Sequence, residues 1–302
     1  MLLKIHRSDR IYKKMMSAKE NERNDLFRYE LMKPFEYKFQ CIGIPLTTNE
    51  QTPFDIVSYA PMMGTYAPNQ VTPELESIVA SLSQDSLWNS CEECLNKVLS
   101  GFVAAGITPN ISEYLFTLLL IDPNNPMHEF LGDCCGDGGF PGYILGTIHP
   151  TKDSIKQLPA TLAHEMNHNI RWQFQPWHPA NTLADYIVSE GIAEYFEEFC
   201  YGSEFVGKWA TTHSEDVVRK TIAPLLNEHL YETDFKKIQA YLYGDSITAM
   251  QQGTPLGVPD YAGYSYGYYL IKDYIAKTDK TIYETTILKT EDIIQTVLEL
   301  SK

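Results

Sequence analysis

The segment His164-Glu165-Met166-Asn167-His168, an H-E-x-x-H motif, is the strongest signal in this 302-residue chain. It lies between Leu158 and Phe174, where apolar residues recur every four positions, which predicts a helix with Pro159 in its first turn. At about 100° per residue, His164 and His168 lie only about 40° apart, roughly opposite the apolar stripe. Two imidazoles one turn apart suit two ligand positions of a tetrahedral zinc site. Glu165 lies beside them, where it can accept a proton from an activated water.

A solvated polar helix face is the competing interpretation of these histidines. It is less favoured because the apolar stripe indicates that the helix is packed, and because Arg171 extends the same polar face. We expect Arg171 to pair with Glu194 or Asp185 and so to fix this helix against the next one.

A third zinc ligand is expected on the following helix, predicted from Thr182 to Tyr201 and ended by Gly202. Glu190 and Glu194 are four residues apart and share a face of that helix. We expect Glu190 to bind the metal and Glu194 to accept the free ring N–H of a ligand histidine.

The small and charged residues around Glu190 predict how closely the two helices approach and which carboxylates face solvent. Gly191 and Ala193 are expected to let the two helices approach closely, which would explain a glycine that costs helix stability. Glu197 and Glu198 fit a solvated face better than Glu190 does, because Glu190 lies among apolar residues.

The rest of the chain predicts an α+β, mostly helical fold. An N-terminal, mainly helical region with a strand near its end is expected over residues 1–125 and a catalytic region over residues 126–302, the two forming one compact unit. Residues 1–37 are expected to form one or two helices. Residues 72–105 show helical spacing, with Gly101 as a candidate stop. Short apolar runs predict strands at residues 117–121 and 143–148. Gly132–Gly146 suits either the edge strand of a small sheet above the metal, where a peptide could pair, or an ordinary loop.

Charge and composition exclude several classes of partner. Lys+Arg minus Asp+Glu is 24 − 39 = −15, a field that repels phosphate, so we expect neither nucleic acid nor an anionic membrane as partner. With no apolar run of about 20 residues and no signal peptide, the chain is expected to be cytoplasmic. Its six cysteines are then mostly thiols. For Cys91/Cys94 and Cys134/Cys135, packing is favoured over a four-thiolate zinc site or a redox role.

The pattern His164-Glu165-x-x-His168-x-x-Arg171, followed by Glu190-Gly191-x-Ala193-Glu194, resembles the YjaZ-type predicted Zn-dependent proteases, a family of unknown function. More distantly it is similar to the gluzincin peptidases, in which the ligand glutamate is followed four residues later by an acid that orients a ligand histidine. The resemblance is specific over roughly residues 140–270. It implies Zn²⁺, a peptidase-like site and a zincin-like fold with a small sheet beside the active-site helix.

A donor to the oxyanion is also needed by a metallopeptidase. The segment from Pro259 to Leu270 contains a Gly-Tyr-x-x-Gly-Tyr pattern similar to one in the same family, and its Tyr264 and Tyr268 are the first candidates. Arg171 and His178 are the others. Packing of aromatic rings beside glycine is the competing interpretation of the tyrosines.

Together these features predict a zinc-dependent hydrolase, foremost a metallopeptidase acting on a peptide or protein, with Glu165 as general base. One alternative is a zinc amidase or esterase for non-peptide substrates, since the metal polarises any carbonyl. The other is a catalytically silent interaction protein that keeps its zinc.

Overall fold

The computed structural model describes residues 1–48 and 52–300, which form two compact units. The first consists of Met1–Leu99 and Ile111–Glu165, and the second of Ser100–Asn110 and the chain from Met166 onward. The divisions fall inside two continuous helices, α6 (Asp85–Ala104) and α8 (Lys152–Phe174). The predicted regions 1–125 and 126–302 divide the chain elsewhere and stay a prediction.

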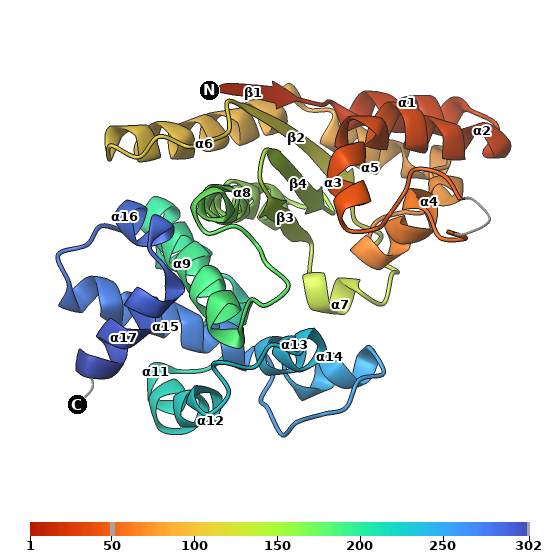
Figure 1. Ribbon diagram of the computed structural model, residues 1–302. Coiled ribbons are helices and arrows are strands. Elements are labelled where there is room, and N and C mark those ends of the chain that lie inside the picture. Colours follow the sequence, from red (N-terminus) through yellow and green to blue (C-terminus); the bar gives the residue numbers. More distant parts are fainter. Residues whose placement is uncertain (49–51, 301–302) are drawn as a thin grey trace. The chain divides into compact units, whose positions relative to one another are not determined.

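A four-stranded mixed sheet forms the centre of the first unit (Figure 1). Its strand order is β1-β2-β4-β3, with β1 parallel to β2, β2 parallel to β4, and β3 antiparallel to β4. The strands span Leu2–Ile5 (β1), Glu113–Leu120 (β2), Cys134–Phe140 (β3) and Tyr143–Ile148 (β4). The strands predicted at residues 117–121 and 143–148 are therefore confirmed. For residues 132–146 both an edge strand and a loop were open, and the structure has the edge strand β3 there.

The N-terminus differs from its prediction, because residues 2–5 form β1 instead of part of a helix. Leu3 pairs with Tyr114 of β2, and the first helix starts only at Ser8. Four residues are too few for a periodic pattern, so only the pairing with β2, more than 100 positions away, reveals this strand.

Helices surround the sheet within the first unit. Besides the first parts of α6 and α8, they are α1 (Ser8–Ser17), α2 (Glu20–Asp25), a π-helix (Leu26–Met32), α3 (Glu36–Cys41), α4 (Ile56–Tyr59), α5 (Glu76–Leu82), α7 (His128–Leu131) and short 3₁₀ turns at Lys33–Phe35, Ala60–Met63, Pro68–Gln70 and Pro73–Leu75. Helix α8 lies directly on the sheet at Gly146, where an added Cβ would lie 2.6 Å from Leu118 and 3.4 Å from Leu162.

Two predicted helix boundaries were wrong. Helix α8 begins at Lys152, so Pro159 lies in its interior and not in its first turn. Helix α6 passes through Gly101, which was expected to end it. An added Cβ at Gly101 would lie 2.4 Å from the hydroxyl of Tyr283, so this glycine makes room for a packed ring.

The second unit contains helices and connecting loops, and no strand among its described residues. It contains the ends of α6 and α8, then α9 (Leu183–Tyr201), α10 (Lys208–Thr211), α11 (Glu215–Val217), a π-helix (Val218–Ile222), α12 (Ala223–Asn227), α13 (Phe235–Tyr243), α14 (Asp245–Met250), α15 (Ala262–Lys277), α16 (Ile282–Ile287), α17 (Thr290–Leu300) and a 3₁₀ turn at Ser203–Phe205. The predicted end of α9 is confirmed, since Gly202 follows it with a φ of 101°.

Helix α15 packs along α9, and glycines set their separation (Figure 1). An added Cβ at Gly191 would lie 2.1 Å from the carbonyl oxygen of Gly267, and one at Gly267 would lie 2.3 Å from that of Ile187. The close approach predicted for Gly191 is therefore made to α15, and not to α8 as expected.

The fold class is α+β and mostly helical, as predicted. No helix in the described part of the chain has both the length and the apolar character needed to cross a membrane.

Candidate metal centre

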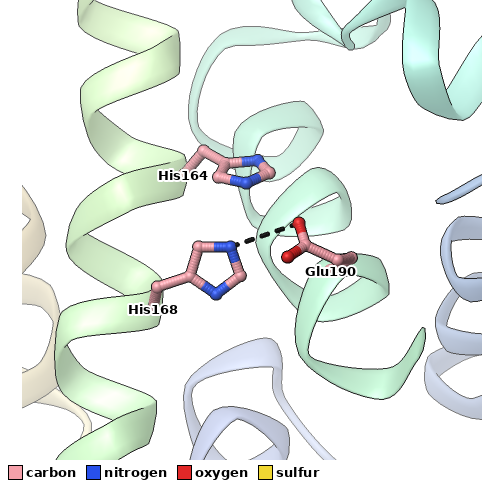
Figure 2. A group of neighbouring side chains, drawn as sticks. All are labelled: His164, His168 and Glu190. Carbon is pink, nitrogen blue, oxygen red and sulfur yellow. Dashed lines mark ion pairs between the residues drawn. The ribbon is translucent and has the colours of Figure 1, made fainter. Parts of the chain in front are cut away.

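Three side chains of the predicted site converge from two helices. Helix α8 contributes His164 and His168 and helix α9 contributes Glu190, and one ligand atom of each lies within 4.8 Å of the other two. Figure 2 shows the two rings and the carboxylate pointing toward one another. Because α8 is one continuous helix, the spacing of its two histidines follows from helix geometry alone, as the sequence predicted.

The ring of His168 is held at both nitrogens. Its Nε2 lies 3.3 Å from Oε2 of Glu190, and its Nδ1 lies 3.1 Å from the hydroxyl oxygen of Ser189. His168 and Ser189 are both buried, with exposed fractions of 7% and 1%. A partner on the second nitrogen fixes the tautomer and the direction of a ligand histidine.

Ser189 was missed from the sequence. Its only signal in the sequence is its position directly before Glu190. Successive side chains on a helix point about 100° apart, so this position does not by itself predict that Ser189 reaches the ring of His168.

Glu165 directly follows His164 on α8 and is buried in the first unit. Its Oε2 accepts a hydrogen bond of 2.6 Å from the backbone N–H of Gly138 on β3. The motif predicted the place of Glu165 on the helix, whereas its strand partner was not predicted.

Two further carboxylates lie near His164. One ligand atom each of His164, Glu194 and Glu197 lies within 4.8 Å of the others. Glu194 therefore lies near His164, and the hydrogen bond expected from the ring N–H of that histidine stays a prediction. Glu197 was expected on a solvated face, and this was wrong: it is only 3% exposed. The error arose because α15 and α16 also pack on α9, so more than one of its faces is covered.

Of the two candidate tyrosines, Tyr264 lies near Glu190, the carboxylate that the sequence predicts as a ligand. Burial, and then the negative charge of Glu190, raise the pKa of Tyr264 well above its ordinary value, and Tyr243 is a hydrogen-bond partner. Tyr268 has different partners: its hydroxyl donates to Oε2 of Glu198 at 2.7 Å and lies 3.1 Å from Nζ of Lys272. Burial raises the pKa of Tyr268 to about 12.

The expected pairing of Arg171 with Glu194 or Asp185 is wrong. The buried guanidinium donates to the carbonyl oxygens of Thr286 (2.9 Å) and Leu288 (3.0 Å) and to the hydroxyl of Thr290 (3.0 Å). These groups lie at the end of α16 and the start of α17, so Arg171 fixes that connection. Burial lowers its pKa to about 10.

The remaining candidates lie elsewhere. His178 is exposed in the α8–α9 loop, where its Nδ1 accepts from the N–H of Ala180. Cys91 and Cys94 are buried in α6, in line with packing. Within the described residues, the groups able to hold a metal contain no cysteine, so the four-thiolate site is not formed.

Comparison with known proteins supports the same chemistry. A family model described as "Predicted Zn-dependent protease (DUF2268)" matches residues 87–295. The uncharacterized protein YjfC of Bacillus subtilis (strain 168) is 30% identical over 284 residues, which cover 94% of each chain. No solved structure matches. The description of the matching family names zinc, the cofactor that the sequence predicts.

Proposed function

Because the chain belongs to this family of predicted Zn-dependent proteases, we propose that it is a metallopeptidase with a zincin-like catalytic region over residues 126–302. The observation that carries the proposal is the convergence of His164, His168 and Glu190, with one ligand atom of each within 4.8 Å of the others. Two imidazoles and one carboxylate are a donor set of catalytic zinc enzymes, in which a fourth position is left for water or substrate.

The surroundings of the three ligands also suit zinc. The hydroxyl of Ser189 on Nδ1 of His168 leaves Nε2 directed at Glu190, the arrangement in which both groups can bind one ion. Zinc, when bound, supplies a Lewis acid that polarises the scissile carbonyl and acidifies water.

Glu165 is the proposed general base. Its carboxylate takes the proton of the attacking water and later delivers it to the nitrogen of the leaving amine. A structural zinc site has no need of this carboxylate, so its burial beside the two histidines favours the enzyme over a silent zinc-binding protein.

Two neighbours have proposed supporting roles. Glu194 accepts the ring N–H of His164 and so holds that ligand in place. Tyr264 donates to the oxyanion, since it lies near Glu190, whereas Tyr268 and Arg171 are bonded to groups outside the three ligands.

A peptide or protein is the proposed substrate. The net charge of −15 supports the proposal that neither nucleic acid nor a membrane is a partner. The six cysteines, which the structure gives as thiols, support the proposal that the chain is located in the cytoplasm.

The first test is the zinc content of wild type, His164→Ala and Glu190→Ala, measured by elemental mass spectrometry. We expect about one zinc per chain in wild type, as one tetrahedral site requires, and a loss in both variants. His178→Ala is the matched control, because it removes an exposed histidine from the neighbouring loop. Wild type without zinc after zinc is supplied would contradict the proposal.

The second test measures turnover on a panel of peptides, esters and amides. Glu165→Gln should keep its zinc, and its kcat should fall on the order of 10²–10⁴-fold, because general-base catalysis typically contributes a factor of this size to the rate. Cleavage confined to esters or non-peptide amides would identify the alternative hydrolase. Zinc without any turnover, and without an effect of Glu165→Gln, would identify the silent binding protein.

A further inference from the structure

The glycine-rich strand β3 contacts the proposed general base directly. The N–H of Gly138 donates to Oε2 of Glu165 at 2.6 Å, and both residues belong to the first unit. The pairing of β3 with β4 is irregular between Asp137 and Phe140, the stretch that contains Gly138. Such an irregularity interrupts the ladder and redirects backbone groups, which here brings an N–H to the carboxylate.

Side chains cannot be accommodated at two positions of this strand. An added Cβ at Gly136 would lie 2.3 Å from Cγ and 2.9 Å from Oε1 of Glu165. One at Gly138 would lie 1.9 Å from the backbone oxygen of Glu165. By contrast, a Cβ at Gly139 would meet only Oδ1 of Asp137, at 3.8 Å. The glycines at positions 136 and 138 are therefore required by the position of Glu165, whereas the glycine at 139 is not.

The residue between these two glycines is fixed by an ion pair. Asp137 lies 2.7 Å from Nζ of Lys38, whose side chain on α3 is only 4% exposed. Because a buried ammonium needs its counter-charge, this pair holds β3 in place from the side of α3. The strand backbone is thus anchored on both sides of the N–H that reaches Glu165.

We propose that Gly136 and Gly138 are positioning residues for Glu165: the Gly138 N–H holds Oε2, and the bare backbone at Gly136 leaves room for the rest of the side chain. The two oxygens of a carboxylate are rigidly linked, so fixing one sets the direction of the other. A general base must lie within hydrogen-bond reach of the proton it takes, and small displacements are costly. This inference rests on the proposed function for the role of Glu165, while the contact itself can be tested without turnover.

The first test follows the Gly138 amide by NMR in the zinc-loaded full-length protein. Asp137–Gly138 is the only Asp–Gly step in the sequence, so labelling aspartate with ¹³C at the carbonyl and glycine with ¹⁵N selects one signal. We expect slow amide exchange in wild type and in Glu165→Gln, whose side chain keeps an acceptor oxygen. In Glu165→Ala exchange should be at least about tenfold faster, because the amide loses its partner. An unchanged signal in Glu165→Ala would overturn the proposal.

The second test compares Gly136→Ala with Gly139→Ala. In Gly136→Ala the methyl group displaces the Glu165 side chain, so we expect the Gly138 signal to shift and kcat to fall about 10- to 100-fold with KM within about threefold. Zinc content should be unchanged, since the ligands are not displaced. Gly139→Ala should match wild type in all four measurements. Wild-type kcat and an unshifted Gly138 signal in Gly136→Ala would contradict the positioning role.

The two proposals can fail separately. If wild type cleaves no peptide but the Gly138 amide responds to Glu165→Ala, the metallopeptidase proposal fails and the contact stands. If wild type cleaves peptides and the amide does not respond, the positioning proposal alone is wrong.

Discussion

Gly191 of α9 and Gly267 of α15 touch backbone to backbone: an added Cβ at residue 191 would lie 2.1 Å from the carbonyl oxygen of Gly267. Gly191 directly follows the proposed ligand Glu190, so the helix crossing and the metal site depend on the same turn of α9. Helix α15 therefore fixes the position of that turn.

Gly191→Ala should accordingly destabilise the protein. Helix propensity alone predicts a gain of roughly 1 kcal/mol from alanine in a helix interior. The backbone contact predicts the opposite, a loss of about 1–3 kcal/mol or more, because the two helices must separate. Denaturant unfolding measures the difference, and a higher unfolding midpoint in the variant would show that the crossing is not tight.

Ser189→Ala should weaken zinc binding without changing the ligands. The hydroxyl holds Nδ1 of His168 at 3.1 Å, and losing such a partner typically costs about 10–100-fold in metal affinity. Competition with a chelator gives the affinity. Ser203→Ala, at an exposed serine shortly after α9, is the control and should bind zinc as wild type does.

Arg171→Met should lower stability rather than catalysis. The change removes three hydrogen bonds to the α16–α17 connection and leaves the carbonyl oxygens of buried Thr286 and half-buried Leu288 without this donor, so we expect a loss of about 2–4 kcal/mol. Below the unfolding temperature, kcat should stay within about threefold of wild type. A large fall in kcat with unchanged stability would instead assign Arg171 to the oxyanion.

Tyr264→Phe and Tyr268→Phe should separate the two tyrosine candidates. Loss of an oxyanion donor usually costs about 10²–10³-fold in kcat, which we expect for Tyr264 alone. Tyr268 donates to Glu198, so its variant should retain most of the activity. Steady-state kinetics on one peptide substrate decides between them, and the reverse ranking would transfer the role to Tyr268.

Stability should fall at alkaline pH as buried tyrosines ionise. Burial raises the pKa of Tyr266 to about 12 from an ordinary value of 10.0. The unfolded chain thus releases its proton first, and the stabilisation present below pH 10 is lost as the pH rises toward 12, by roughly 2–3 kcal/mol for this group. Urea unfolding between pH 9 and pH 12, with Tyr266→Phe for comparison, measures the loss. An equal decline in the variant would exclude Tyr266 as its source.

The parts of the site that the sequence predicted are those set by local geometry. His164 and His168 share a face because they are four residues apart in a helix, and the same holds for Glu190 and Glu194. The end of α9 at Gly202 and the strands β2 and β4 also follow from short-range patterns of apolar and breaking residues.

The features that the sequence did not predict depend on residues far apart in the chain. The strand β1 exists through its pairing with β2, Glu197 is buried because other helices pack on α9, and Arg171 reaches a connection more than 100 residues away. The contact of Gly138 with Glu165 requires β3 to lie against α8. The periodicity of a sequence describes one helix or strand at a time, so it predicts which residues share a face of a helix. The groups that hold the proposed ligands and the proposed base in place are brought to them by the packing of separate elements.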